Sequence, residues 1–260
     1  GNVGAGCLGK RTGLARGSTV DSDDRLDDLG RPDARITYGT INTRALRKLD
    51  YRIGVSDAMV DLLIDRRFDP ERIFAIYNGL DFTPRTPSMD RATFFRSVGL
   101  DADDTCVVAG IAARLNPVKD IATLIRGFAR AHAEYPPLRL LIAGDGEEME
   151  SLKKLAADLG VAKEVCFAGW VSDTDSFYHA LDINTLTSIS ETFPYVLTEG
   201  ARAGLPTISS KVGGVSYLID HGANGFLFPP GDDRALANHL LTLARDPALR
   251  KAMGHKLYEK

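Results

Sequence analysis

The chain is poor in the residues that mark several classes of protein. Its 260 residues include three cysteines, one tryptophan and four methionines. Cys7, Cys106 and Cys166 stand far apart, so reduced thiols are a better interpretation than a disulfide framework or a metal site. No apolar run approaches the roughly 20 residues that a membrane-spanning helix needs. The net charge of −3 leaves no basic excess, which argues against a nucleic-acid-binding protein.

The rest of the composition is that of an ordinary globular protein. Hydrophobic residues make up 44% of the chain and charged residues 26%, which is typical of soluble domains. The length allows one large domain or two small ones. The chain begins at Gly1 without a methionine or a visible leader, and Lys260 falls inside a helical pattern. We therefore expect a sequence that is truncated at both ends.

From residue 105 onward, predicted strands alternate with predicted helices. Apolar runs predict strands at residues 106–113, 138–144, 164–169, 183–187, 207–210 and 226–228. Helical spacing predicts helices at 120–134, 147–159 and 175–180, around Glu199, and at 215–221 and 232–245. Strands that alternate with helices at short intervals predict an α/β fold with a doubly wound parallel sheet. Such a sheet binds its ligand at the carboxyl ends of its strands.

The first hundred residues have a less regular pattern. They predict strands at residues 17–20, 51–56 and 73–77, helices at 35–48 and 56–67, and a turn at 78–81. Residues 82–104 contain Pro84 and Pro87 among mixed charges, which predicts a connector with one helix at 91–98.

Two glutamates near a predicted helix start are the most informative feature. Glu191 precedes the helix, and Glu199 lies eight positions further on, inside it. The N-terminus of a helix offers N–H groups and a positive dipole end to a pyrophosphate. Glu199 could then accept hydrogen bonds from ribose hydroxyls, and Glu191 could touch a sugar or its phosphate. Each glutamate taken alone is better explained as an acid that favours the helix dipole.

The elements that follow this pair make the pattern specific. Gly204-Leu205-Pro206, Gly213-Gly214-Val215 and Pro229-Pro230-Gly231-Asp232 follow in order. Together with the E-x7-E pair, they resemble the signature of retaining GT-B glycosyltransferases of the GT4-like group, also called glycosyl transferases group 1. The resemblance implies two Rossmann-like domains with doubly wound parallel sheets. Residues 1–83 would be the C-terminal part of an incomplete acceptor-side domain, and residues 84–260 the donor-binding domain.

The resemblance also implies roles for single residues. Arg114 and Lys119 would bind the donor phosphates and stabilise the leaving nucleoside diphosphate. Glu191 would contact the donor sugar or its phosphate, and Glu199 would bind the ribose. The phosphate would lie against the backbone N–H groups of Phe193, Tyr195 and Val196, and the base against Gly169, Trp170 and Val171. For Trp170, packing on a neighbouring helix is a nearly equal alternative.

One position departs from the family pattern. Relatives often carry a histidine near the reaction centre, and here Asp21 stands in its place. Aspartate accepts hydrogen bonds but cannot act as an acid–base group near neutral pH. Asp21 either replaces the histidine as an acceptor or impairs that step. Asp21-Ser22-Asp23 is better read as a solvated acidic loop than as a metal site, so we expect neither a metal nor another cofactor.

The resemblance predicts transfer of a sugar from a nucleotide-sugar, UDP-linked by preference, to an acceptor hydroxyl. Anomeric retention, metal independence and a place in polysaccharide or glycolipid biosynthesis are implied with it. The expected partners are the donor and a sugar, lipid-linked or small-molecule acceptor, in the cytoplasm, with peripheral contact at the inner membrane face left open. The alternatives are a degenerate nucleotide-sugar-binding protein without turnover, favoured by Asp21, and a GT-B epimerase. A phosphorylase is disfavoured because no convincing pyridoxal-phosphate lysine is present.

Overall fold

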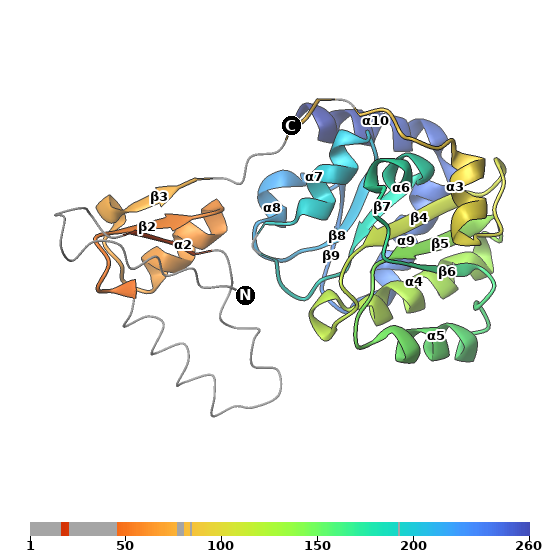
Figure 1. Cartoon of the computed structure of the whole chain (residues 1–260), viewed down its shortest axis with the longest axis horizontal. Coiled ribbons are helices and arrows are strands. Elements are labelled where there is room, and N and C mark those ends of the chain that lie inside the picture. The colour runs from red at the N-terminus through yellow and green to blue at the C-terminus, as the bar shows by residue number, and fades with distance from the viewer. Residues whose placement is uncertain (1–16, 21–45, 77–80, 84, 192) are drawn as a thin grey trace. The chain divides into compact units, whose positions relative to one another are not determined.

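The computed structural model describes residues 17–20, 46–76, 81–83, 85–191 and 193–260. The chain forms two compact units (Figure 1). The smaller unit comprises Gly1–Leu80 and Ser190–Phe193, and the larger unit comprises Asp81–Ile189 and Pro194–Lys260.

The smaller unit contains a parallel sheet in the order β1-β2-β3. Its described elements are β1 (Gly17–Val20), β2 (Tyr51–Gly54), α2 (Asp57–Asp65), the 3-10 turn η1 (Pro70–Arg72) and β3 (Ile73–Ala75). Ser56 begins α2 as its N-cap and accepts a hydrogen bond from the N–H of Met59 at 3.3 Å. The predicted strands at 17–20, 51–56 and 73–77 are therefore confirmed in position, and the helix predicted at 35–48 lies largely outside the described residues.

The larger unit is built on six parallel strands in the order β6-β5-β4-β7-β8-β9. Their bounds are β4 (Val107–Ala112), β5 (Leu138–Ala143), β6 (Val165–Gly169), β7 (Ile183–Leu186), β8 (Thr207–Ser210) and β9 (Gly225–Phe228). The chain builds outward from β4 in one direction and then from β7 in the other. The doubly wound sheet predicted from the sequence is confirmed. Its topological switch point lies between β4 and β7, where such sheets leave a crevice at their carboxyl edge.

Helices follow the strands and cover both faces of this sheet (Figure 1). They are α3 (Arg91–Val98), α4 (Ile121–Glu134), α5 (Met149–Asp158), α6 (Thr174–Ala180), α7 (Tyr195–Arg202), α8 (Val215–Leu218), α9 (Asp233–Arg245) and α10 (Pro247–Glu259), with the 3-10 turn η2 (Pro117–Lys119) after β4. The helix predicted at 91–98 has the predicted bounds. Gly160, one residue beyond the C-cap of α5, has a φ of +75°, which is typical of a glycine that ends a helix.

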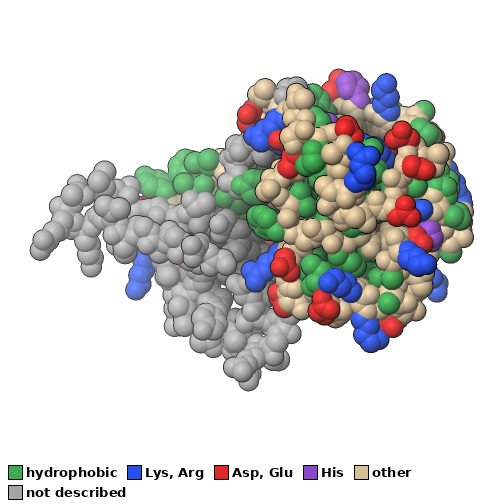
Figure 2. Space-filling model, turned by 45° about the vertical axis from the view of Figure 1, so that its right-hand side comes forward, with side chains coloured by type: hydrophobic (Ala, Val, Ile, Leu, Met, Phe, Trp, Pro, Cys, Tyr) green, Lys and Arg blue, Asp and Glu red, His purple; other side chains and the backbone are tan. Residues whose placement is uncertain are grey.

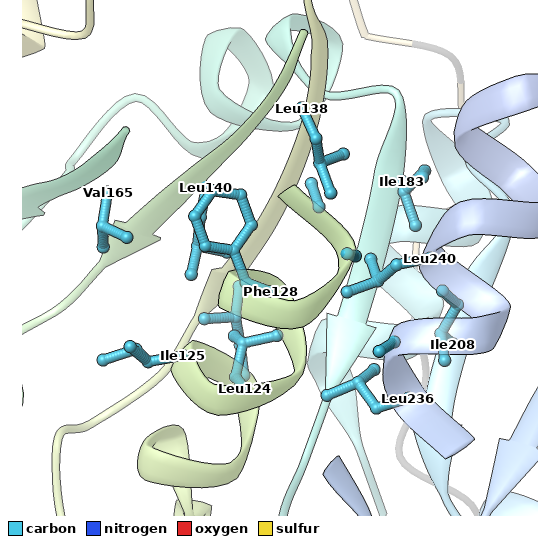
Figure 3. Close-up of a cluster of buried hydrophobic side chains, with 14 of the residues drawn as sticks. Leu124, Ile125, Phe128, Leu138, Leu140, Val165, Ile183, Ile208, Leu236 and Leu240 are labelled. Carbon is cyan, nitrogen blue, oxygen red and sulfur yellow. The ribbon is translucent and has the colours of Figure 1, made fainter. Parts of the chain in front are cut away.

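The alternation of side chains along β4 explains the two layers of core. Val107, Ala109 and Ile111 face one cluster of buried side chains, and Val108 faces another, because successive strand residues point to opposite faces. Figure 3 shows the first cluster, in which α4 and α9 cover the sheet. Its labelled members are Leu124, Ile125, Phe128, Leu138, Leu140, Val165, Ile183, Ile208, Leu236 and Leu240. The second cluster lies under α3 and α6.

The surface of the larger unit mixes both signs of charge. On the face drawn in Figure 2, lysine and arginine side chains alternate with acidic ones, in keeping with the near-neutral net charge. Within the described part of the chain, every helix is either too short or too polar to cross a lipid bilayer.

Candidate functional site

The carboxyl edge of the six-stranded sheet holds a cleft of about 640 Å³. Three loops surround it, those that follow β4, β5 and β6. Its lining residues are Ala112, Ala113, Arg114, Ala143, Gly144, Asp145, Trp170, Val171, Ser172 and Thr174. The cleft therefore lies where a doubly wound sheet is expected to bind its ligand.

Two glycines allow these loops to approach each other closely. A Cβ on Gly144 would lie 1.9 Å from the carbonyl oxygen of Ala113, and one on Gly146 would lie 2.2 Å from that of Leu115. Gly144 also has a φ of +130°, which only glycine adopts readily. The amide of Leu115 donates to the Asp145 carbonyl at 2.9 Å and fixes the contact. Gly144-Asp145-Gly146 is thus a tight turn between β5 and α5, and it forms one wall of the cleft.

The third wall comes from the end of β6. Gly169 has a φ of +65°, and its carbonyl accepts the N–H of Gly144 at 2.7 Å. Trp170 lines the cleft with 83% of its surface exposed, so it does not pack on a neighbouring helix, which was the alternative. Val171 lines the cleft beside it. An indole face left open in a cleft is available for stacking on a planar ligand group.

Arg114 brings a positive charge to the cleft. Its side chain is 74% exposed and lies 3.9 Å from the Glu147 carboxylate. An exposed pair of this length contributes little to stability, about 0–1 kcal/mol. Burial raises the pKa of the nearby Glu148 carboxyl, and the charges of Glu147 and Asp120 raise it further. The Arg114 guanidinium is therefore largely open to solvent at the cleft, where an anionic ligand could reach it.

Lys119 is held at the switch point by its backbone. It ends η2, where the Asn116 side chain accepts its N–H at 3.2 Å. The Thr187 hydroxyl, just after β7, donates to the Lys119 carbonyl at 2.8 Å. The amide of Ile189 donates to the Val118 carbonyl, also at 2.8 Å. The loops after β4 and β7 are therefore joined, although 68 residues separate Lys119 from Thr187 along the chain.

The segment between β7 and α7 contains the first glutamate of the pair. Glu191 and Phe193 are half-buried and belong to Ser190–Phe193, which groups with the smaller unit. Asp21, the residue that departs from the family pattern, lies outside the described residues.

The N-terminus of α7 has no side-chain cap. Pro194 is the N-cap residue, one position before the first helical turn, and its carbonyl accepts the N–H of Leu197 at 3.0 Å. Tyr195, which is 46% exposed, and Val196 begin the helix. The N-cap residue therefore adds no side-chain oxygen to the positive end of the helix dipole, an arrangement that suits the binding of an anion.

Glu199 has a partner that the sequence did not reveal. The hydroxyl of Tyr178, on α6, donates to Oε2 of Glu199 at 2.9 Å. Tyr178 is 1% exposed. Burial raises the pKa of its phenol well above its ordinary value, and the charge of Glu199 raises it further. The hydroxyl therefore keeps its proton and remains a donor.

A second link joins the same two helices. Arg202 of α7 and Asp175 of α6 form an ion pair at 2.8 Å, with the arginine side chain 9% exposed. Gly200 lies between these contacts and packs against the buried Asn184 of β7. The segment that carries Glu199 is therefore fixed by α6 and by the sheet. Of the described residues, none form a group of three or more metal-ligating side chains.

Two curated glycosyltransferases are similar in sequence to this chain. The chain is 31% identical to the lipopolysaccharide core biosynthesis glycosyltransferase LpsE of Rhizobium meliloti over 206 residues, which are 79% of this chain and 56% of LpsE. It is 30% identical to a D-inositol 3-phosphate glycosyltransferase of Streptomyces scabiei, covering 88% of this chain and 53% of that protein. The chain thus spans about half the length of the curated relatives it matches.

Solved structures share the fold. The crystal structure of Anabaena HepE in complex with UDP-glucose superposes with a TM-score of 0.81 at 24% identity, over 94% of this chain and 66% of HepE. The predicted GT-B architecture is confirmed by this likeness. The family model for glycosyl transferases group 1 matches residues 91–260, a range that contains the cleft, α6 and α7. The chain belongs to the glycosyl transferases group 1 family, as the glutamate pair and its following motifs predicted.

Proposed function

We propose that this chain carries the donor site of a glycosyltransferase that uses a nucleotide-sugar. The observation that carries the proposal is the carboxylate of Glu199, held by Tyr178 inside a helix whose N-terminus has no side-chain cap. That helix follows β7 at the switch point of the sheet. A nucleoside diphosphate combines an anion for the helix start with ribose hydroxyls for a carboxylate, and both groups find partners on α7.

The rest of the donor fits the cleft by its chemistry. The base would lie against Trp170 and Val171, which offer an exposed indole and a half-buried apolar side chain. Arg114 and Lys119, from the loop after β4, would bind the diphosphate. We propose UDP as the nucleotide, which is supported by the UDP-glucose bound to the structurally similar HepE.

The proposed reaction moves the sugar with retention at the anomeric carbon. The bond between that carbon and the diphosphate oxygen breaks, and a bond to the acceptor oxygen forms on the same face. The acceptor proton passes to a donor phosphate oxygen, and the nucleoside diphosphate leaves. Arg114, Lys119 and the α7 N-terminus would stabilise its developing charge, and Glu191 would contact the sugar. Because two cations and a helix dipole supply positive charge, we propose that no divalent metal is required.

We propose a polysaccharide or glycolipid as the product. The support comes from a relative, LpsE, which is named for lipopolysaccharide core biosynthesis. The acceptor is then a sugar or a lipid-linked sugar whose hydroxyl attacks the donor. Peripheral contact with a membrane would follow if that acceptor is lipid-linked.

The test is a calorimetric titration of the protein with UDP, GDP, ADP and their sugar conjugates, in buffer containing EDTA. We expect one nucleotide to bind, and Glu199→Ala to weaken it about ten- to a hundredfold, because a hydrogen bond to a charged group contributes about 1.5–3 kcal/mol. The matched control is Glu150→Ala, which removes an exposed glutamate from α5. Equal affinities in wild type and Glu199→Ala would refute the proposed site, and binding that requires a metal would refute metal independence.

A further inference from the structure

A hydrogen bond between α6 and α7 fixes the side chain of Glu199, the residue proposed to bind the ribose of the donor. Tyr178 is the sole residue of α6 with a hydrogen bond to Glu199 among the described residues, and its hydroxyl lies 2.9 Å from Oε2. The phenol ring is buried under α6, where it contacts Phe177 with ring centroids 5.1 Å apart. A ring so enclosed has one available orientation, so the hydroxyl is a fixed donor.

This hydrogen bond makes the two carboxylate oxygens of Glu199 unequal, because one of them is bound by the protein. Oε2 accepts from Tyr178, and within the described residues no further hydrogen bond of the Glu199 side chain is present. Glu199 itself is half-buried. A glutamate with three rotatable bonds would otherwise sample several rotamers at a helix surface. The Tyr178 hydroxyl selects the rotamer that turns Oε1 outward.

We propose that Tyr178 is a positioning residue that orients Glu199 for the paired hydroxyls of the donor's ribose. This inference rests on the proposed function, because it needs a ribose at Glu199. One carboxylate oxygen, Oε2, is held by the phenol, and the other, Oε1, is presented to the ligand. Tyr178 touches no substrate and acts through Glu199.

A purely structural role for Tyr178 makes a different prediction from the positioning role. Tyr178 could instead serve only to hold α6 against α7, and then any loss of contact between these helices would have the same effect on the ligand. The ion pair between Asp175 and Arg202 links the same two helices at 2.8 Å and does not involve the Tyr178 hydroxyl. Asp175→Asn is therefore the matched control for helix contact. Tyr135→Phe is the matched control for the loss of a phenol hydroxyl at the opposite, amino-terminal edge of the sheet.

The experiment compares UDP with 2′,3′-dideoxy-UDP, which lacks both ribose hydroxyls. In the wild type we expect UDP to bind about thirtyfold more tightly, because a carboxylate that accepts a hydroxyl contributes about that factor. In Tyr178→Phe the ratio should fall to about threefold, mainly through weaker UDP binding, while Asp175→Asn and Tyr135→Phe keep the wild-type ratio. The double variant Tyr178→Phe/Glu199→Gln should have the same ratio of UDP to 2′,3′-dideoxy-UDP affinity as Glu199→Gln alone, because Tyr178 acts only through Glu199. Melting temperatures for each variant establish that the fold is intact.

The outcomes separate the inference from the function on which it rests. A wild-type ratio near one would overturn the proposed ribose contact of Glu199, and the role of Tyr178 with it. A wild-type ratio of tens that Tyr178→Phe leaves unchanged would overturn the positioning role alone. A loss of discrimination in Asp175→Asn equal to that in Tyr178→Phe would assign the effect to helix contact and would also overturn it.

Discussion

Helices α6 and α7 begin at the same edge of the same sheet, yet their N-termini are treated differently. At α6 the Asp173 carboxylate accepts the N–H of Ser176 at 3.0 Å and also the hydroxyl of Ser88. At α7 the corresponding position is Pro194, which has no side-chain oxygen to offer. Both helices present unsatisfied N–H groups and a positive dipole end. In α6 the N-cap residue supplies an anion, and in α7 the N-cap residue supplies none.

The difference assigns the two helices separate tasks. The capped helix α6 is a rigid support: its aromatic residues pack in the core under α3, and Tyr178 reaches Glu199. The uncapped helix α7 carries the residues proposed to meet the donor. We propose that the N-cap residues reflect separate tasks of these two helices, support for α6 and donor binding for α7, and substitutions in both helices test that proposal.

The largest effect is expected where α7 packs on the sheet. A Cβ on Gly200 would lie 2.4 Å from Nδ2 and 3.0 Å from Cβ of Asn184, an approach that real structures do not tolerate. Asn184 is fully buried and donates to the Val196 carbonyl at 3.0 Å, so it cannot move aside without losing that bond. We expect Gly200→Ala to lower the free energy of unfolding by about 3 kcal/mol.

Urea denaturation of wild type and Gly200→Ala measures this loss. The control is Gly160→Ala at the end of α5, where no atom lies within 4 Å of an added Cβ but φ is +75°. That substitution reports backbone strain without a clash, about 1 kcal/mol. If Gly200→Ala lowered the free energy of unfolding no more than Gly160→Ala does, the close packing of α7 on β7 would be contradicted.

An intermediate effect is expected from giving α7 the cap that α6 has. Pro194→Asp would place a carboxylate where the diphosphate is proposed to bind, and we expect about a thirtyfold loss of UDP affinity, about 2 kcal/mol. Stability should change little, since a new cap adds about 1 kcal/mol and the loss of proline removes a similar amount. Calorimetry and thermal melting measure the two quantities.

Pro194→Ser is the matched control, because serine caps the helix without adding charge. It should weaken UDP binding less than Pro194→Asp does. If the aspartate variant bound UDP as well as the serine variant, the phosphate would not lie at the start of α7.

Much of the larger unit could be predicted from its sequence because buried parallel strands consist of continuous runs of apolar residues. The segment at 106–113 differs from β4 by one residue at each end, and the helix at 91–98 is bounded by Asp90 and Gly99, whose cap roles are local. The glutamate pair could also be picked out, because both residues lie in one short segment at a fixed spacing. These features depend on neighbours in the chain.

The partner of Glu199 depends on neighbours in space. Tyr178 lies 21 residues away on another helix, in a segment whose Phe177 and Ala180 predict only a buried face. The neighbouring residues in the sequence do not distinguish a tyrosine that only packs in the core from one that also donates a hydrogen bond to a carboxylate. The same limit applies to Asp120, which has a φ of +44°, in the left-handed region, where η2 ends and α4 begins.

The smallest effect is expected from removing the charge of the α6 cap. Asp173→Asn keeps the size of the side chain and its ability to cap the helix, so we expect only the charge–dipole contribution to be lost, about 0.5 kcal/mol in the free energy of unfolding, with UDP affinity unchanged. The Ser176 hydroxyl, followed by the Ser88 hydroxyl and the Ser176 amide, holds the pKa of the Asp173 carboxyl below its ordinary value of 3.8.

A folded-state pKa below the unfolded one means that the ionised cap stabilises the protein above about pH 4 and that this contribution is lost as the pH falls further. Urea denaturation at pH 7, 5, 4 and 3 should therefore show a wild-type stability that falls more steeply below pH 4 than that of Asp173→Asn. The two proteins should converge at acid pH, because the wild-type cap is then protonated and resembles the asparagine. Parallel curves would mean that the Asp173 charge contributes nothing to α6. A fall in UDP affinity in Asp173→Asn, at a pH where it is folded, would show that the capped helix also meets the donor, and the division of tasks between the two helices would be lost.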